Sequence, residues 1–150
     1  MIYSKSGRYA IRAMVHIALH PGELVRAADI AAAESIPPSY LAKVLQSLKR
    51  KRLLSSTRGR TGGFQLGRPA ETITAIQVVD AVEDTRRLRE ECVLGLEVCS
   101  DSTPCSLHKH WGPFRDRALE ILGSLTVAEM AGELTSKRSG PAGSGPSPGR

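Results

Sequence analysis

The chain has 150 residues, enough for one domain with a proper hydrophobic core that needs no disulfides. It holds an odd number of cysteines, its amino terminus lacks the apolar run of a secretory signal, and no segment approaches the ~20 apolar residues that cross a bilayer. We therefore expect a reduced, cytoplasmic protein without a membrane partner. The net charge is +6, and residues 1–68 alone hold 12 Lys or Arg against 3 Asp or Glu. This basic half favours a polyanion partner, although a solvated basic surface would have the same composition.

The first half predicts three successive helices. Residues 6–20 place apolar side chains on one face, and Pro21 and Gly22 end that helix. A short Ala-rich helix is expected over 27–34, followed by a tight turn and a third helix over 38–52. The apolar side chains that this third helix is expected to bury recur at helical spacing: Leu41, Val44, Leu45 and Leu48.

A short helix, a tight turn and a helix with a polar, basic outer face are typical of a helix-turn-helix, whose second helix enters the DNA major groove. An ordinary amphipathic helix with a solvated face is the alternative. Residues 53–69 then predict two short strands around the segment RGRTGG, a β-hairpin wing whose arginines suit the minor groove. The residues expected to contact DNA are Ser39, Tyr40, Lys43, Gln46, Arg50, Arg58 and Arg60. The expected fold class is mainly α with a small β-hairpin, and the winged helix-turn-helix domain would span residues 1–70.

All three cysteines fall within residues 92–108, in the pattern C-x6-C-x5-C-x2-H. Three thiolates and an imidazole form a complete four-ligand set for a metal centre: Cys92, Cys99, Cys105 and His108. Structural zinc sites usually pair cysteines at C-x2-4-C, so the wider spacing here favours an iron-sulfur cluster. A reactive sensor thiol and a Cys-His enzyme are weaker alternatives. Nothing in the sequence announces the oxyanion hole or pocket of an enzyme, so we expect no catalytic residues.

The second half, residues 71–134, is expected to hold a connecting helix over about 75–84, the cysteine loop and a long dimerisation helix to about 125. The spacing of the apolar residues after the loop is that of a coiled-coil seam: Leu107, Trp111, Phe114, Ala118, Ile121 and Leu125. A core-facing helix of a monomer is the alternative. Pro113 lies inside the pattern, so the helix either kinks there or begins its regular part there. Residues 135–150 are rich in Gly, Pro and Ser and predict a disordered tail.

Four segments precede the cysteine loop in this order: SGRYAIRAM, IPPSYLAKVLQSLKRKRLL, RGRTGGFQLGRP and ITAIQVVDAVE. In that order and spacing, residues 1 to about 134 resemble the IscR/NsrR-type family of winged helix-turn-helix iron-sulfur transcription regulators. The resemblance implies a homodimeric protein that binds a double-stranded DNA operator, acts as a repressor, and depends on an iron-sulfur cluster. The same regulator with a zinc or thiol redox switch, or an iron-sulfur carrier, would be the alternatives; a carrier has no use for the wing.

The resemblance also concerns the fourth ligand. In the iron-sulfur cluster regulators a histidine at the position of His108 completes the site, whereas the nitric-oxide-sensing branch uses an acidic residue at a position held here by Arg8. Arginine cannot ligate iron. Three cysteines with a histidine imply a 2Fe-2S centre, while the first gap, six residues instead of the usual five, leaves 4Fe-4S open. Ala42 and Lys43 stand where the cluster regulators carry Glu and Gln, so the operator sequence also stays open.

Overall fold

The computed structural model describes residues 3–96 and 100–139. The elements in chain order are α1 (Lys5–Ala18), α2 (Ala27–Glu34), α3 (Pro38–Arg50), β1 (Leu54–Thr57), β2 (Gly63–Leu66), the 3-10 turn η1 (Ala70–Thr72), α4 (Ala75–Asp80), α5 (Arg86–Glu90), α6 (His108–Ser124) and α7 (Val127–Ser139). The predicted fold class, mainly α with a small β-hairpin, is confirmed. None of the described helices combines the length and the apolar character that a membrane span requires.

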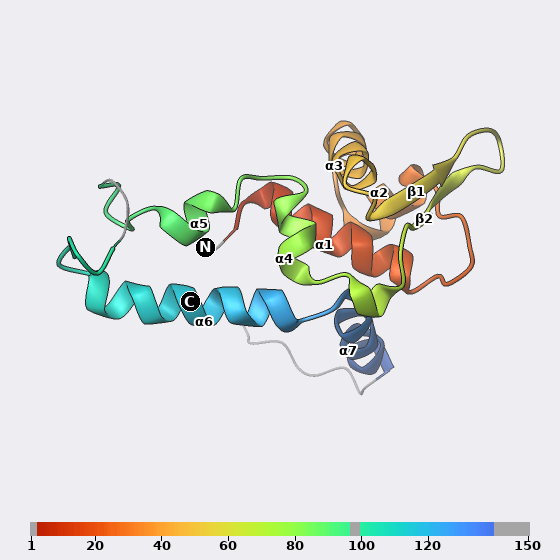
Figure 1. The fold of residues 1–150 in the computed structure, drawn as a ribbon. Helices are drawn as coiled ribbons and strands as arrows, with labels where there is room; N and C mark the ends of the chain where they lie inside the picture. The colour runs from red at the N-terminus through yellow and green to blue at the C-terminus, as the bar shows by residue number, and fades with distance from the viewer. Residues whose placement is uncertain (1–2, 97–99, 140–150) are drawn as a thin grey trace, which may run out of the picture.

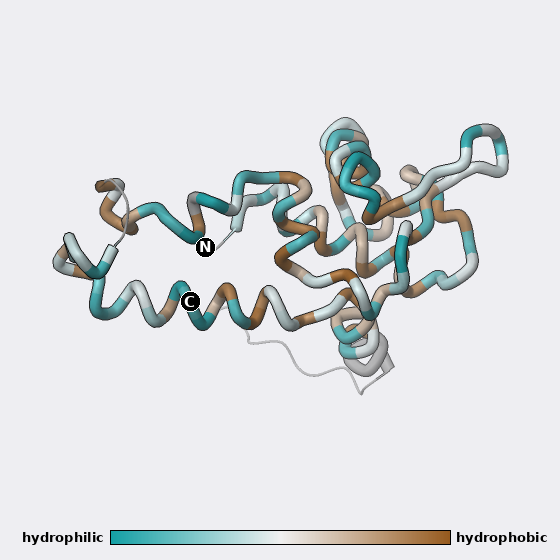
Figure 2. The backbone as a smooth tube through the Cα atoms, in the orientation of Figure 1, coloured by the Kyte–Doolittle hydropathy of each residue, from teal (hydrophilic) through white to brown (hydrophobic). Residues whose placement is uncertain are grey.

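Helices α1 to α3 and the hairpin form a compact head around one core, and Figure 2 shows apolar segments gathered there. The four apolar residues predicted to be buried on α3 are all within 3% exposure, so its amphipathic pattern was assigned correctly. Helix α3 ends at Arg50, two residues before the predicted end. Helix α2 is held to α1 by Glu34, whose carboxylate is 3.1 Å from His16 Nδ1 and 3.1 Å from Arg12 Nε.

The hairpin has the predicted wing form, with antiparallel β1 and β2 in a register that pairs Leu54 with Leu66 and Thr57 with Gly63. The backbone of Val25, just before α2, adds a third short partner through hydrogen bonds of 2.9 and 2.8 Å with Phe64. This close approach explains the glycine at position 63, since a Cβ there would lie 2.8 Å from the Val25 carbonyl oxygen. The tip of the hairpin, between β1 and β2, extends beyond the helices of the head (Figure 1).

The second half differs from the sequence prediction at several boundaries. Helix α4 covers Ala75–Asp80 and is shorter than the expected 75–84, and the five-residue α5 was not predicted. Helix α6 runs through Pro113 from His108, so its regular part does not begin at the proline. Helix α7 reaches Ser139, so a tail beginning at residue 135 was placed too early; residues 140–150 lie outside the described residues.

Helix α7 brings the end of the described chain back to the head. The α6–α7 junction pairs with the η1–α4 junction through two backbone hydrogen bonds of 2.8 Å, from Ala75 N–H to the Leu125 carbonyl and from Val127 N–H to the Ile73 carbonyl. Val127 is fully buried. A capping-box sequence, Thr126 followed by Glu129, marks the start of α7 and could have revealed this helix from the sequence.

The contact between Val25 and the wing can be tested with two glycine substitutions. Gly63→Ala should lower the free energy of unfolding by about 1–3 kcal/mol, because the new Cβ must displace backbone. Gly132→Ala in α7 has no atom within 4 Å of its new Cβ and should raise stability by up to about 1 kcal/mol through helix propensity. Urea unfolding measures both, and a Gly63→Ala variant as stable as the parent would contradict the close approach.

Candidate nucleic-acid interface and metal centre

The outer face of α3 carries the predicted polar and basic residues in exposed positions. Ser39, Tyr40, Lys43, Gln46 and Arg50 are all exposed. A surface groove of about 520 Å³ is lined by Lys43, Gln46, Ser47, Lys49 and Arg50. Ser47 and Lys49 also line this groove, although neither was among the predicted DNA contacts. The face therefore offers several cations and hydrogen-bonding groups on one rigid helix.

Tyr40 is exposed on the outer face of α3, and it also contacts helix α1 within the head. Its hydroxyl lies 2.6 Å from the Ser6 hydroxyl of α1, and its ring packs edge-on against the Tyr9 ring at a centroid distance of 5.4 Å. The side chain is still 37% exposed. Tyr40 thus links the first turn of α3 to the first turn of α1.

The wing tip presents the other predicted basic residues. Arg58 and Arg60 are exposed in the loop that joins β1 to β2. Gly59 between them has φ +108°, in the region that favours glycine, and its carbonyl accepts a hydrogen bond of 3.0 Å from Gly62 N–H. A Cβ at Gly62 would overlap the Thr57 carbonyl oxygen, so the tight tip requires glycine there. The loop carries its two arginines away from the core.

The structure brings two of the predicted metal ligands together. Cys92, at the end of the segment after α5, is buried, and Cys105, before α6, is partly buried; both are free thiols. Hydrogen bonds lower the pKa of the Cys92 thiol, chiefly from the backbone of Leu94 and also from the Cys105 thiol and the backbone of Leu96, while burial opposes them. The Cys105 thiol is therefore near enough to Cys92 to favour its thiolate. Cys99, the third predicted ligand, lies outside the described residues.

His108 begins α6, one turn after Cys105. Its backbone N–H donates to the Cys105 backbone carbonyl at 3.0 Å, and its ring Nε2 lies 2.8 Å from an Asp101 carboxylate oxygen. The His108 side chain is 14% exposed, whereas His110 is an exposed residue. Within residues 3–96 and 100–139, no three His, Cys, Asp or Glu side chains gather closely enough to hold a metal ion. The described part of the loop thus places the Cys105 thiol near Cys92 and the His108 ring against Asp101, without gathering them into one group.

Only part of the predicted seam on α6 is exposed. Leu107, Phe114 and Ile121, spaced seven residues apart, are 43%, 54% and 46% exposed. Trp111 is partly buried and contacts Phe114 with ring centroids 5.4 Å apart. Ala118 is only 8% exposed and faces its own chain, with Gly112 and Leu122, and Leu125 is half-buried at the α7 junction. The predicted seam therefore has two parts. Leu107, Phe114 and Ile121 form an exposed stripe, whereas the other predicted residues pack at least partly against their own chain.

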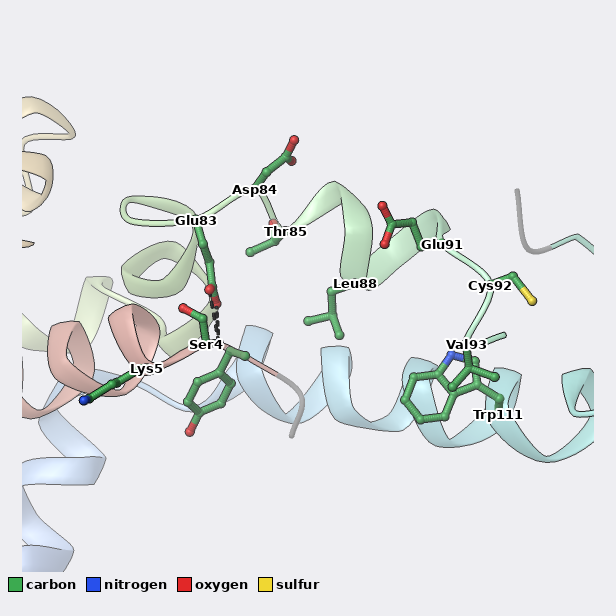
Figure 3. A pocket seen from close by; sticks show the side chains of 11 residues that line it. Ser4, Lys5, Glu83, Asp84, Thr85, Leu88, Glu91, Cys92, Val93 and Trp111 are labelled. Carbon is green, nitrogen blue, oxygen red and sulfur yellow. Dashed lines mark hydrogen bonds between the residues drawn. The ribbon is translucent and has the colours of Figure 1, made fainter. Parts of the chain in front are cut away.

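A cavity of about 760 Å³ joins the cysteine-bearing half to the head (Figure 3). Residues from three regions line it: Ser4 at the start of α1, the segment from Glu83 through Leu88 to Cys92, and Trp111 of α6. The cavity therefore lies between Cys92 and the amino end of α1, so a rearrangement around Cys92 would affect that end of the helix.

Known proteins share both the sequence and the fold of this chain. A family model named Rrf2, described as "Iron-dependent Transcriptional regulator", matches residues 3–133. The HTH-type transcriptional regulator IscR of Xenorhabdus nematophila is 35% identical over 131 residues, covering 87% of this chain and 79% of that protein. The structure of CymR (YrzC), the global cysteine regulator of B. subtilis, is similar with a TM-score of 0.71 and 27% identity, covering 87% of this chain and 95% of that one.

The structure of T. potens IscR is similar with a TM-score of 0.72, covering 93% of this chain and 92% of that one. At 23% identity, this likeness concerns the fold alone.

The lowered pKa of the Cys92 thiol predicts how this residue responds to pH in reduced, metal-free protein. Because hydrogen bonds stabilise its thiolate, Cys92 should become reactive toward iodoacetamide at a lower pH than an ordinary cysteine. Cys105→Ala removes one donor and should move the midpoint of Cys92 alkylation to higher pH, while Cys105→Ser keeps a hydroxyl donor and should move it less. Mass spectrometry of the Cys92 peptide gives the midpoint. An unchanged midpoint in Cys105→Ala would contradict the influence of Cys105 on the pKa of Cys92.

Proposed function

Since the chain belongs to the Rrf2 family of transcriptional regulators, we propose that it is a repressor whose operator binding is controlled by an iron-sulfur cluster. As a member of this family, it regulates transcription at DNA and is not an enzyme. The observation that carries the cluster proposal is the proximity of the Cys92 thiol, after α5, to the Cys105 thiol, just before α6.

The donors of the cysteine loop fit such a cluster in kind and in number. Cys92, Cys99 and Cys105 would supply thiolates and His108 an imidazole, a set that suits a 2Fe-2S centre, with 4Fe-4S as the alternative. Asp101 supports the role of His108, because ligating histidines usually give their other ring N–H to a carboxylate. When bound, the cluster would supply one-electron redox chemistry. Its loss would act as a signal to the protein. Iron also agrees with the iron dependence of the Rrf2 family.

A thiol switch is the second candidate, since the Cys105 thiol is near enough to Cys92 to favour its thiolate. The Staphylococcus aureus CymR, whose structure is 26% identical with a TM-score of 0.70, has been solved in an oxidized form. A disulfide between Cys92 and Cys105 would leave Cys99 and His108 without a task. The cluster proposal uses all four residues, and we favour it for this reason.

We propose that the chain acts as a homodimer through α6. The exposed stripe of Leu107, Phe114 and Ile121 is regularly spaced along this long helix, and a second copy would bury it. Two heads related by a two-fold axis would then read half-sites about 34 Å apart. Because the cysteine loop leads directly into α6, binding or losing a cluster would change the relative position of the heads, and thereby operator affinity.

Purification without oxygen tests the cluster. We expect reddish-brown protein with visible thiolate-to-iron absorption, iron and acid-labile sulfide. Colourless protein that carries stoichiometric zinc after reconstitution would contradict the proposal. Colourless protein with a Cys92–Cys105 disulfide would favour the thiol switch.

His108 and His110 provide a matched pair for the fourth ligand. His108→Ala should leave a labile cluster, and His108→Cys should keep a cluster with a lower reduction potential, because a thiolate adds negative charge. The parent cluster should lose stability as the pH falls toward about 6.5, since protons compete for the imidazole, and this dependence should weaken in His108→Cys. His110→Ala should change neither property. Absorbance and potential between about pH 6 and 9 measure both; a His108→Ala variant equal to the parent places the fourth ligand elsewhere.

The DNA surface can be tested with single cation removals. Arg58→Ala should weaken operator binding and reduce the salt slope by about 0.9 per phosphate contact, with little change in base preference. Lys43→Ala should relax the preference at one base position by about 1–3 kcal/mol. Arg117→Ala removes the same charge from an exposed position on α6 and serves as the control. Parent-like binding by both Arg58→Ala and Lys43→Ala, measured by fluorescence anisotropy, would mean that the surface is misplaced.

A further inference from the structure

The amino end of α1 contains an incomplete capping motif. Ser4 is the N-cap, and its hydroxyl accepts hydrogen bonds from the backbone N–H groups of Ser6 and Gly7 at 3.1 and 3.4 Å. In a capping box, a Glu or Gln three residues after the cap accepts the N–H of the cap residue in return. Here that position is Gly7, and the first turn has no acidic residue. The sequence near Ser4 therefore supplies only half of the box.

Glu83, from the segment after α4, supplies the missing half. The Ser4 N–H lies 3.2 and 3.1 Å from the two Glu83 carboxylate oxygens, as the dashed lines in Figure 3 show. A Cβ on Gly7 would lie 2.9 Å from Glu83 Oε1, so glycine leaves the space that the carboxylate occupies. The negative charge also suits the positive end of the helix dipole. The chain contains an ordinary local capping box in α7, between Thr126 and Glu129, for comparison.

The same turn of α1 also contacts the helix that faces DNA. Ser6, two residues after the cap, shares the 2.6 Å hydrogen bond with the Tyr40 hydroxyl. Tyr40 lies in the first turn of α3, where its N–H and that of Leu41 donate to the Pro37 carbonyl at 3.0 and 2.9 Å. One turn of α1 is thus held between Glu83 on one side and the amino end of α3 on the other.

Glu83 in turn belongs to the cysteine-bearing half. It lines the same cavity as Leu88, Cys92 and Trp111, and the segment from Glu83 to Cys92 borders this cavity along its length (Figure 3). A short stretch of chain that includes α5 connects Cys92 to Glu83. A displacement of Cys92 would therefore be transmitted along this stretch to the carboxylate that completes the α1 cap.

We propose that Ser4, Gly7 and Glu83 form a capping box closed by tertiary contact, and that Glu83 and Tyr40 are positioning residues that set the amino end of α3 according to the state of the cysteine loop. The regulatory part of this inference rests on the proposed function; the positional part does not. Neither residue needs to touch the cluster for this role.

Hydrogen exchange of full-length, cluster-free protein without DNA tests the positional part. Glu83→Ala should make the Tyr40 and Leu41 amides exchange about three- to tenfold faster, the range expected when a helix cap is lost. Glu83→Gln should restore slow exchange, because Gln also completes capping boxes. Glu129→Ala breaks the local box of α7 and should leave both amides unchanged. Parent-like exchange in Glu83→Ala, or an equal increase in Glu129→Ala, would overturn the inference.

Gly7→Ala keeps the test decisive if Glu83→Ala does not fold. The added Cβ displaces the Glu83 carboxylate while it improves helix propensity, so a purely structural role predicts slower exchange at Tyr40 and the positioning role predicts faster exchange.

Operator affinity, measured with and without cluster on a duplex that the parent selects from a random pool, then tests the regulatory part. The ratio of the two dissociation constants should fall about threefold or more toward one in Glu83→Ala and not in Glu129→Ala. A parent that loads no cluster contradicts the proposed function, while the exchange result still decides the positional role. A parent-like ratio in Glu83→Ala overturns the regulatory role.

Discussion

The burial of α1 is the interaction on which the rest of the structure depends. Its inner face, including Ala10, Ala13, Met14 and Ile17, is at most 2% exposed, and the helix packs against α2, α3, α4, α7 and β2. Small residues at positions 10 and 13 allow neighbouring backbones to approach closely. Because one helix supports the DNA-facing helix and the segments that lead to the cysteines, neither half can move without affecting it.

The two halves differ in how much apolar surface they bury. The head has a continuous core, whereas the far end of α6 and the cysteine segment bury few side chains of their own. The apolar turn after Cys92 is open to solvent, with Val93, Leu94 and Leu96 between 43% and 60% exposed. A region with so small a core gains order from what it binds, and this suits the proposed cluster and the proposed dimer.

Metal binding, dimerisation and DNA reading are thus proposed for separate surfaces that share one framework. The basic residues lie on α3 and the wing, the donor residues lie around the start of α6, and the apolar stripe follows the same helix. The cavity beside Cys92 and Trp111 borders the segment that carries Cys92, helix α6 and the amino end of α1.

The sequence by itself determined the features that depend on near neighbours in the chain. Helical spacing identified the buried face of α3, and the glycines of RGRTGG identified the wing, because periodicity and positive φ are local properties. Local spacing also placed His108 one turn after Cys105, although its ligand role stays a prediction. Helix α5 was missed because five residues carry no periodic signal, and α7 because its capping box was overlooked.

Only the tertiary structure decided the contacts between distant residues. Ser4 and Glu83 are 79 residues apart, Ser6 and Tyr40 are 34 apart, and neither pair has a spacing that a local rule recognises. The inward face of Ala118 and the meeting of the Cys92 and Cys105 thiols likewise follow from how α5 and α6 pack. Such contacts depend on the packing of whole helices, and the energy of that packing is distributed over the entire core instead of any one segment.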